Sequence, residues 1–145
     1  LLLAGQIGWL FDDTLERIQQ MQARGLDIVL RHIISDADLP AVYALARALI
    51  LPAFYEGFGL PALEAMACGT VPIVSDRSSL PEIVGDVGIQ INPDDPHTLY
   101  DALVRVLDDP GWVADMRRVA VARACEFTWE RSARIVLDVY RKHIS

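Results

Sequence analysis

Residues 49–64 read LILPAFYEGFGLPALE, and this stretch decides the fold of the chain. Its apolar beginning predicts a strand that ends at Pro52. Two glycines then leave the backbone open to close approach by a ligand, and Pro61 suits the first turn of a helix, where its missing N–H is not needed. The stretch therefore predicts a strand, a glycine loop and a helix over about 61–68. Glu56 precedes the two glycines of the loop, and Glu64 lies in the predicted helix that follows them.

The same order of elements repeats along the whole chain. The predicted strands cover residues 1–4, 27–30, 49–52, 71–75 and 88–91. Amphipathic segments lie between them, and three more helices follow. The predicted helix caps are Asp12 or Asp13, Asp36 or Asp38, and Ser78 or Ser79. Strands that are apolar on both faces belong to a parallel sheet covered by helices. We therefore expect a Rossmann-like, doubly wound α/β fold, with a mostly parallel sheet of about five strands and helices on both faces, forming one domain over 1–145.

Topology places the glycine loop at the edge where such folds bind ligands. In open α/β sheets, ligands lie beyond the carboxyl ends of the strands, so the loops at 5–9, 31–35, 53–59 and 75–79 should converge there. The N–H groups of Phe58 to Leu60, at a helix start, favour an anion. A carboxylate accepts two hydrogen bonds at once, which suits a vicinal diol. A phosphate with diols on both sides describes a nucleotide-sugar.

Composition excludes several other classes of protein. The net charge of −7 over 145 residues argues against a nucleic-acid or polybasic membrane surface. No apolar run approaches the ~20 residues of a membrane helix. Cys68 and Cys125 lie far apart and indicate buried thiols in a reducing compartment, hence the cytoplasm. The glycine fingerprint of a dinucleotide-binding dehydrogenase and the Gly-Lys-Ser/Thr of a P-loop do not occur in the sequence.

The residues from Glu56 to Glu64 resemble the paired-glutamate motif of the retaining family 4 glycosyltransferases of the GT-B fold. The resemblance runs in colinear order over almost the whole chain. The blocks that carry it are Gly5 with 8–9, then 35–39, 54–61, 63–69, 75–76, 78–82, 85–86 and 127–130.

This resemblance implies a role for each matching residue. Glu56, the catalytic candidate, would hydrogen-bond the donor hexose, and Glu64 would accept from the ribose hydroxyls. The residues whose N–H groups would meet the sugar and diphosphate are Gly57, Phe58, Gly59 and Leu60. The residues that would border the base are Arg31, His32 and Ile33. Members of the family transfer the sugar with retention and generally need no metal, so no cofactor and no metal site are expected.

The resemblance also implies that the chain is a C-terminal donor-binding part, truncated at its beginning. One further strand and helix, with an Arg and a Lys for the diphosphate, and the acceptor-binding N-terminal domain would precede it, and Gln6 stands where many relatives have a basic residue. The helix over 128–145 would pack on that N-terminal domain. We expect the chain alone not to transfer sugar. The parent enzyme is expected to be a cytoplasmic hexosyltransferase of bacterial surface polysaccharide synthesis with a GDP-hexose donor and a glycan or lipid-linked acceptor, and peripheral association with the inner membrane face is left open.

Several alternatives stay open at this point. Arg31 and His32 could equally form a solvated loop pair. Ser78, Ser79 and Glu82 fit structural capping better than donor contact, and Trp9 and Trp112 fit packing. The chain as a whole could be a non-catalytic nucleotide-sugar-binding or interaction module.

Overall fold

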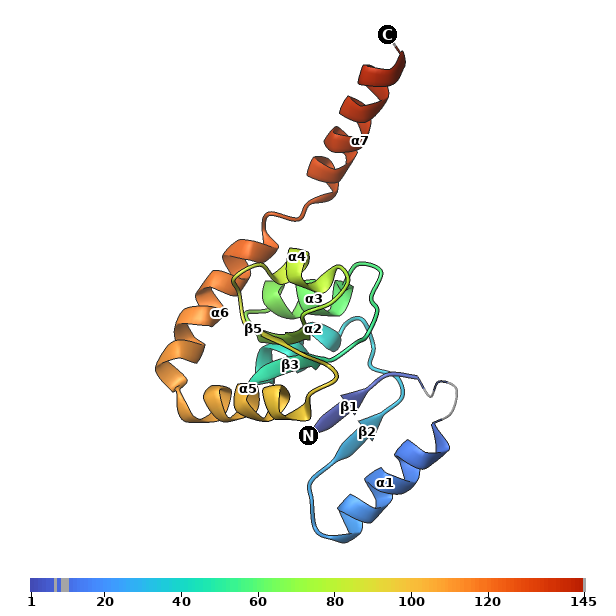
Figure 1. Cartoon of the computed structure of the whole chain (residues 1–145), viewed down its shortest axis with the longest axis vertical. Coiled ribbons are helices and arrows are strands. Elements are labelled where there is room, and N and C mark those ends of the chain that lie inside the picture. Colours follow the sequence, from blue (N-terminus) through green and yellow to red (C-terminus); the bar gives the residue numbers. More distant parts are fainter. Residues whose placement is uncertain (7, 9–10, 145) are drawn as a thin grey trace. The chain divides into compact units, whose positions relative to one another are not determined.

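The computed structural model describes residues 1–6, 8 and 11–144, so Trp9 lies outside the described residues. Strands and helices alternate along the first two thirds of the chain, and three helices end it (Figure 1). The strands are β1 (Leu2–Ala4), β2 (Val29–Arg31), β3 (Ala48–Leu51), β4 (Val71–Ser75) and β5 (Ile89–Ile91). The helices are α1 (Asp12–Ala23), α2 (Leu39–Leu45), α3 (Leu60–Ala67), α4 (Leu80–Val84), α5 (Pro96–Asp108), α6 (Pro110–Ala124) and α7 (Trp129–Ile144).

The chain divides into two units, Leu1–Leu39 and Pro40–Ser145. In the first unit, β1 and β2 pair in parallel, with Leu2 opposite Val29 and Ala4 opposite Arg31. Helix α1 connects them, as a parallel pair requires. Among the described residues of this unit, Ile18 of α1 is the one buried side chain.

The second unit holds a parallel sheet in the order β3-β4-β5. All five residues of the central strand β4 are buried. Alternate residues of a strand point to opposite faces, and β4 follows this rule, because Val71 and Ile73 belong to one apolar cluster and Val74 to another. Helices therefore cover both faces of this sheet.

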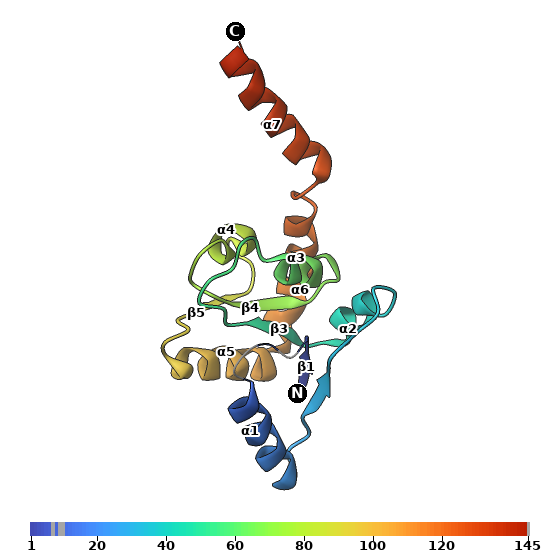
Figure 2. The ribbon, with the colours of Figure 1, turned by 90° about the vertical axis from the view of Figure 1, so that its right-hand side faces the viewer.

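The two clusters assign the covering helices to faces. Residues of α3 and α4, such as Met66 and Leu80, pack with Val74. Residues of α5, such as Val106, pack with Ile73 on the opposite face, and both views show α5 across the sheet from α3 and α4 (Figures 1 and 2). Helix α6 contributes to both clusters, through Val113 at one end and Ala120 at the other.

The predicted α/β class with parallel strands and helices on both faces is confirmed. The strands pair as two sheets, β1-β2 and β3-β4-β5, where the sequence had suggested one. Each described strand lies within two residues of its predicted start.

Two of the predicted helix caps are wrong in their chemistry. Helix α1 has Phe11 at its N-cap, with no side-chain cap, and Asp12 and Asp13 lie inside the first turn, where a negative charge suits the helix dipole. Ser79 does hold the N-cap position of α4, but its hydroxyl does not cap the helix. Helix α2 begins directly after Asp38, and the capping of this helix by Asp36 or Asp38 stays a prediction.

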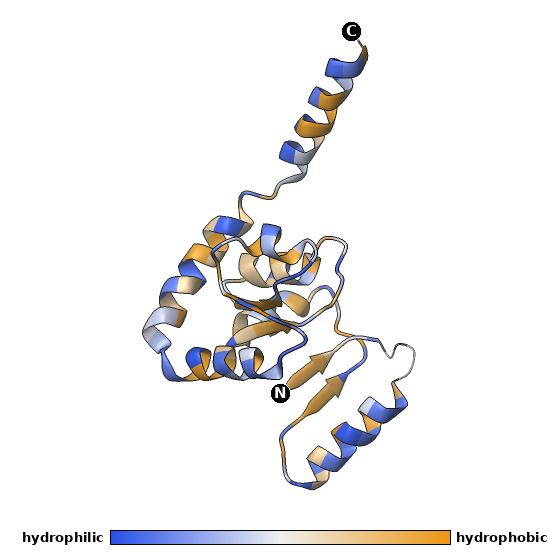
Figure 3. Cartoon of the chain, in the orientation of Figure 1, coloured by the Kyte–Doolittle hydropathy of each residue, from blue (hydrophilic) through white to orange (hydrophobic). Residues whose placement is uncertain are grey.

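Helix α7 carries apolar side chains that the rest of the described chain does not bury. None of its described residues is buried, and its ribbon alternates between the colours of apolar and polar residues (Figure 3). Its packing on an N-terminal domain stays a prediction. No helix in the described ranges is both long and apolar enough to cross a membrane.

Candidate functional site

The candidate site is the loop that joins β3 to α3 at the carboxyl edge of the three-stranded sheet. The strands β4 and β5 end at the same edge, with Ser75 and Ile91. The hydroxyl of Ser75, fully buried, donates to the backbone oxygen of Ala53 at 2.5 Å. This contact fixes the beginning of the loop to the end of the central strand.

The middle of the loop is held by two serines that precede α4. Ser78 Oγ donates to the backbone oxygen of Glu56 at 2.6 Å and lies 3.3 Å from its backbone nitrogen. Ser79 Oγ lies 2.9 Å from the backbone oxygens of both Glu56 and Phe58. The hydroxyl groups therefore fasten the loop to the neighbouring loop, and this explains why Ser79 does not cap its own helix.

Gly59 is required by backbone conformation and by packing. Its φ is +103°, in the region that favours glycine. A Cβ at this position would lie 2.8 Å from Cδ2 of Leu80. Gly57 differs, because a Cβ there would meet nothing within 4 Å. The structure thus explains Gly59 by the fold, and it leaves open space where a Cβ of residue 57 would lie.

The start of α3 presents unused backbone donors. Within the part of the chain that the structure describes, the N–H groups of Phe58, Gly59 and Leu60 make no hydrogen bond. Pro61 follows and has no N–H. The positive end of the helix dipole lies at the same place. This arrangement suits an oxyanion such as a phosphate.

The Glu56 carboxylate folds back onto its own loop. It is half-buried, and its Oε1 accepts a hydrogen bond of 3.1 Å from the N–H of Gly57. The N–H of Gly57 is therefore engaged inside the loop, whereas those of the next three residues are not. The side chain of Phe58 is 44% exposed and meets Phe127 edge to face, with ring centroids 6.3 Å apart.

The Glu64 carboxylate lies on the exposed side of α3, one turn beyond the helix start. Its Oε2 accepts a hydrogen bond of 3.1 Å from the hydroxyl of Tyr43 in α2. Burial, together with the nearby negative charge of Glu64, raises the pKa of Tyr43 to about 12. Tyr43 therefore stays neutral and remains a hydrogen-bond donor to this carboxylate throughout the physiological range.

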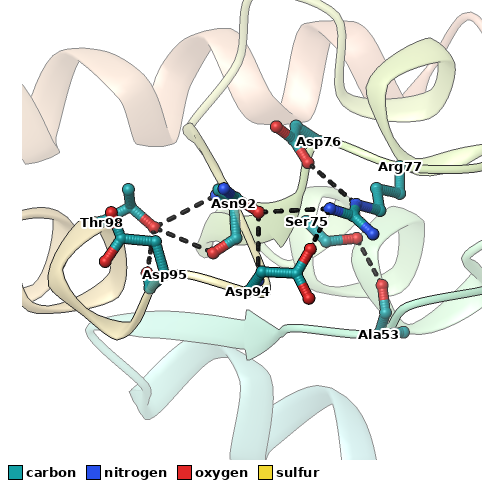
Figure 4. A network of polar contacts seen from close by, with 8 residues as sticks. All are labelled: Ala53, Ser75, Asp76, Arg77, Asn92, Asp94, Asp95 and Thr98. Atoms are coloured by element: carbon teal, nitrogen blue, oxygen red, sulfur yellow. Dashed lines mark hydrogen bonds and ion pairs between the residues drawn. The ribbon is translucent and has the colours of Figure 1, made fainter.

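A network around Arg77 occupies the adjoining part of the edge (Figure 4). The guanidinium pairs with Asp94 and reaches Asp76 at 3.7 Å. It also lies 5.9 Å from the ring centre of Phe54, at the start of the glycine loop. This cation is therefore neutralised by two carboxylates.

Sequence reasoning missed two residues of this site, Arg77 and Tyr43. The sequence could have indicated Arg77, since this residue lies in the 75–79 loop, which was expected at the carboxyl edge of the sheet, where ligands bind. For Tyr43 the sequence offered none, because its partner Glu64 is 21 residues away.

Arg31, His32 and Ile33 lie in the other unit, at the end of β2 and directly after it. All three are exposed, and Ile33 is 79% exposed. The guanidinium of Arg31 comes no closer than 3.5 Å to the backbone oxygen of Leu30. The residues that the structure brings together are thus Glu56, the 57–60 loop and Glu64, all within the second unit.

A parallel sheet with a glycine loop, unused N–H groups at a helix start and a carboxylate on each side of that loop defines a domain of the α/β class whose loop donors suit an anion. Residues 1–109 match the family described as glycosyl transferases group 1, and the chain belongs to this family. The resemblance to GT-B glycosyltransferases is thereby confirmed.

Known proteins similar to the chain agree with this assignment. The O-antigen chain mannosyltransferase B of Escherichia coli is 38% identical over 97% of the chain, which spans 37% of that relative. Sucrose-phosphate synthase from Thermosynechococcus elongatus superposes with a TM-score of 0.81 at 32% identity, over 99% of this chain and 38% of that one. Anabaena Alr3699/HepE, solved in complex with UDP, has the same fold, with a TM-score of 0.83 at 21% identity, over 97% of this chain and 40% of that one. The chain thus spans two fifths or less of each of these proteins.

Proposed function

We propose that this chain is the donor-binding part of a retaining glycosyltransferase that moves a hexose from a nucleotide-sugar to a glycan or lipid-linked acceptor. The observation that carries the proposal is the row of unused N–H groups at Phe58, Gly59 and Leu60. They lie at the start of α3 with a carboxylate on each side. A diphosphate fits the N–H groups, and the hydroxyl groups of its two sugars fit Glu56 and Glu64.

In this arrangement Glu56 orients the hexose and supports charge that develops at its anomeric carbon. Oε1 of Glu56 accepts from the N–H of Gly57, and the remaining acceptor sites of this carboxylate are available to the hexose hydroxyls. Glu56 is not assigned as a nucleophile, since a glycosidase-like pair would need both acids at one sugar. Arg31, His32 and Ile33 would border the base.

Mannose is the hexose that we favour, and bacterial surface polysaccharide is the product. The support is the name of the relative that is 38% identical, a mannosyltransferase of the O-antigen chain. A GDP-linked donor is proposed from the resemblance to family members with a similar 78–82 segment, and a UDP-linked donor is the alternative that the titration tests. The same proposal places the parent enzyme in the cytoplasm and gives it an N-terminal acceptor-binding domain on which α7 packs. It also includes catalysis without a metal.

Calorimetric titration of the chain with GDP, UDP, GDP-mannose and UDP-glucose tests the proposal. We expect one nucleotide pair to bind in preference to the other, with affinity unchanged by EDTA. Replacing Glu64 by Ala should weaken binding by about 1.5–3 kcal/mol, the value of a lost hydrogen bond to a charged group. Glu130→Ala, an exposed acid in the first turn of α7, is the matched control.

Two outcomes would contradict the proposal. No detectable nucleotide binding at millimolar concentration would favour a purely structural module. An affinity that Glu64→Ala leaves unchanged would remove the ribose role of this residue. Transfer of mannose is then sought with the complete protein that contains the chain, and a complete protein that binds donor but never transfers sugar would favour the non-catalytic alternative.

A further inference from the structure

The second carboxylate of the site is exposed, yet its position is defined. Exposed glutamates sample several rotamers, and each must be ordered when a ligand binds. Here Oε2 of Glu64 is held by the hydroxyl of Tyr43 at 3.1 Å. An ionised carboxylate has about four acceptor sites, so one donor leaves Oε1 and part of Oε2 available for a ligand.

Tyr43 itself belongs to a segment that is fixed at several points. Its backbone oxygen accepts a hydrogen bond from the hydroxyl of Thr70, which is fully buried. The guanidinium of Arg117 in α6 donates to the backbone oxygens of Ala44 at 2.9 Å and Ala46 at 3.3 Å. Arg117 also donates to Gly69, which ends the turn after α3, at 2.6 Å. The end of α2 and the turn after α3 are therefore joined through a single side chain.

The phenol is suited to hold a carboxylate because it can act only as a donor towards it. Tyr43 is half-buried. Burial and the adjacent Glu64 charge disfavour the tyrosinate and raise the pKa of Tyr43 to about 12. The contact thus persists at every pH at which an enzyme of this class would work.

We propose that Tyr43 is a positioning residue that orients the Glu64 carboxylate for the vicinal hydroxyls of the ribose. This inference rests on the proposed function, since it needs a nucleotide whose ribose reaches Glu64. Tyr43 need not touch the nucleotide. Its contribution is to fix the carboxylate before the ligand arrives, which reduces the ordering cost of binding.

The test compares nucleotides with and without ribose hydroxyls. Dissociation constants of the chain are measured for GDP and 2′,3′-dideoxy-GDP, and for UDP and its dideoxy form. The variants are Tyr43→Phe, Glu64→Gln and, as a matched control, Tyr100→Phe at an exposed tyrosine of α5. The dissociation constant of the dideoxy form divided by that of the hydroxylated form reports ribose recognition alone. Thermal unfolding checks that each variant is folded.

Tyr43→Phe should weaken binding of the hydroxylated nucleotide about three- to tenfold, the range of one hydrogen bond. It should leave the dideoxy form within about twofold, so the ratio falls. Tyr100→Phe should keep the wild-type ratio. A ratio that Tyr43→Phe leaves unchanged overturns the inference, whether both affinities are unaltered or both fall equally as from a general structural role.

Failure of the inference and failure of the proposed function give different results. If Glu64→Gln abolishes ribose discrimination but Tyr43→Phe does not, only the positioning role of Tyr43 is wrong. If Glu64→Gln leaves the discrimination intact, the ribose role of Glu64 is overturned, and the role of Tyr43 with it. If the wild-type chain binds neither nucleotide, the proposed function itself is overturned.

Discussion

At the scale of single residues, the site combines positions that the fold requires with positions that it does not. Gly59 has a backbone conformation that other residues rarely adopt, and its Cα faces Leu80. Gly57, two residues earlier, has open space around it. Glycine is therefore required by the fold at position 59 and not at position 57, although both residues belong to the same sequence motif.

Replacing Gly59 by Ala should lower the free energy of unfolding by about 1–3 kcal/mol. The left-handed conformation costs a residue with a Cβ about 1–2 kcal/mol, and the new Cβ would lie 2.8 Å from Leu80 Cδ2. Urea denaturation measures the change. Gly57→Ala, with nothing within 4 Å of its Cβ, should stay close to the wild type, and equal losses for the two variants would contradict this distinction.

The contact between Tyr43 and Glu64 should appear in the pH dependence of stability. The pKa of Tyr43 is raised from 10.0 to about 12 in the folded chain. Below pH 10 the phenol of Tyr43 is neutral in the folded and in the unfolded chain, and its contribution to the free energy of unfolding is complete. As the pH rises from 10 to 12, the phenol loses its proton in the unfolded chain first. The contribution to stability is therefore lost across this window. The difference in urea midpoint between wild type and Tyr43→Phe should shrink across this window. A constant difference between pH 9 and 12 would refute the shift.

At the scale of elements, the site depends on hydroxyl groups that join one loop to the next. Ser75 ties β4 to the start of the glycine loop, and Ser79, at the beginning of α4, ties its middle. The loop over 53–59 is thus part of the sheet edge and not an independent segment.

Ser79→Ala should destabilise the chain by about 1 kcal/mol, because the half-buried hydroxyl serves the backbone oxygens of Glu56 and Phe58. Hydrogen exchange of the amides around Phe58 should quicken in parallel. Ser132→Ala, on the exposed surface of α7, provides the comparison. If the two variants have the same stability, the hydroxyl contacts of Ser79 do not hold the loop.

Local sequence patterns predicted the helices and strands well. They could not predict contacts between residues that lie far apart in the sequence. The apolar run at 71–75 became β4 because both faces of that strand are buried. Pro61 and Gly59 correctly indicated where α3 begins. By contrast, the cap assigned to Ser79 was wrong because its hydroxyl partners lie more than 20 residues away. The Tyr43–Glu64 pair could not be predicted for the same reason, since periodicity describes one helix at a time.

At the scale of the whole molecule, the apolar interior is unevenly distributed. Both clusters of buried residues lie within the unit that begins at Pro40. Among the described residues of the other unit, one side chain is buried. Stability should therefore be concentrated around β4.

Native-state hydrogen exchange should show this difference directly. Amides of β4 should exchange at the rate of global unfolding, and those of β1, β2 and α1 at least about tenfold faster, because few buried contacts oppose their opening. Mass spectrometry of peptides from each unit measures both rates. Equal protection of β1 and β4 would contradict the expected distribution.

The guanidinium of Arg117 has a consequence for sequence variation. Its Nε serves Gly69 and its Nη2 serves Ala44 and Ala46, so donors at separate points of a planar group are in use. A lysine carries all its donors on one atom and cannot reproduce that spread. A single nucleotide change can convert an arginine codon into a lysine codon. At this position such a change keeps the positive charge but loses hydrogen bonds to the backbone. Natural selection should therefore disfavour lysine at position 117.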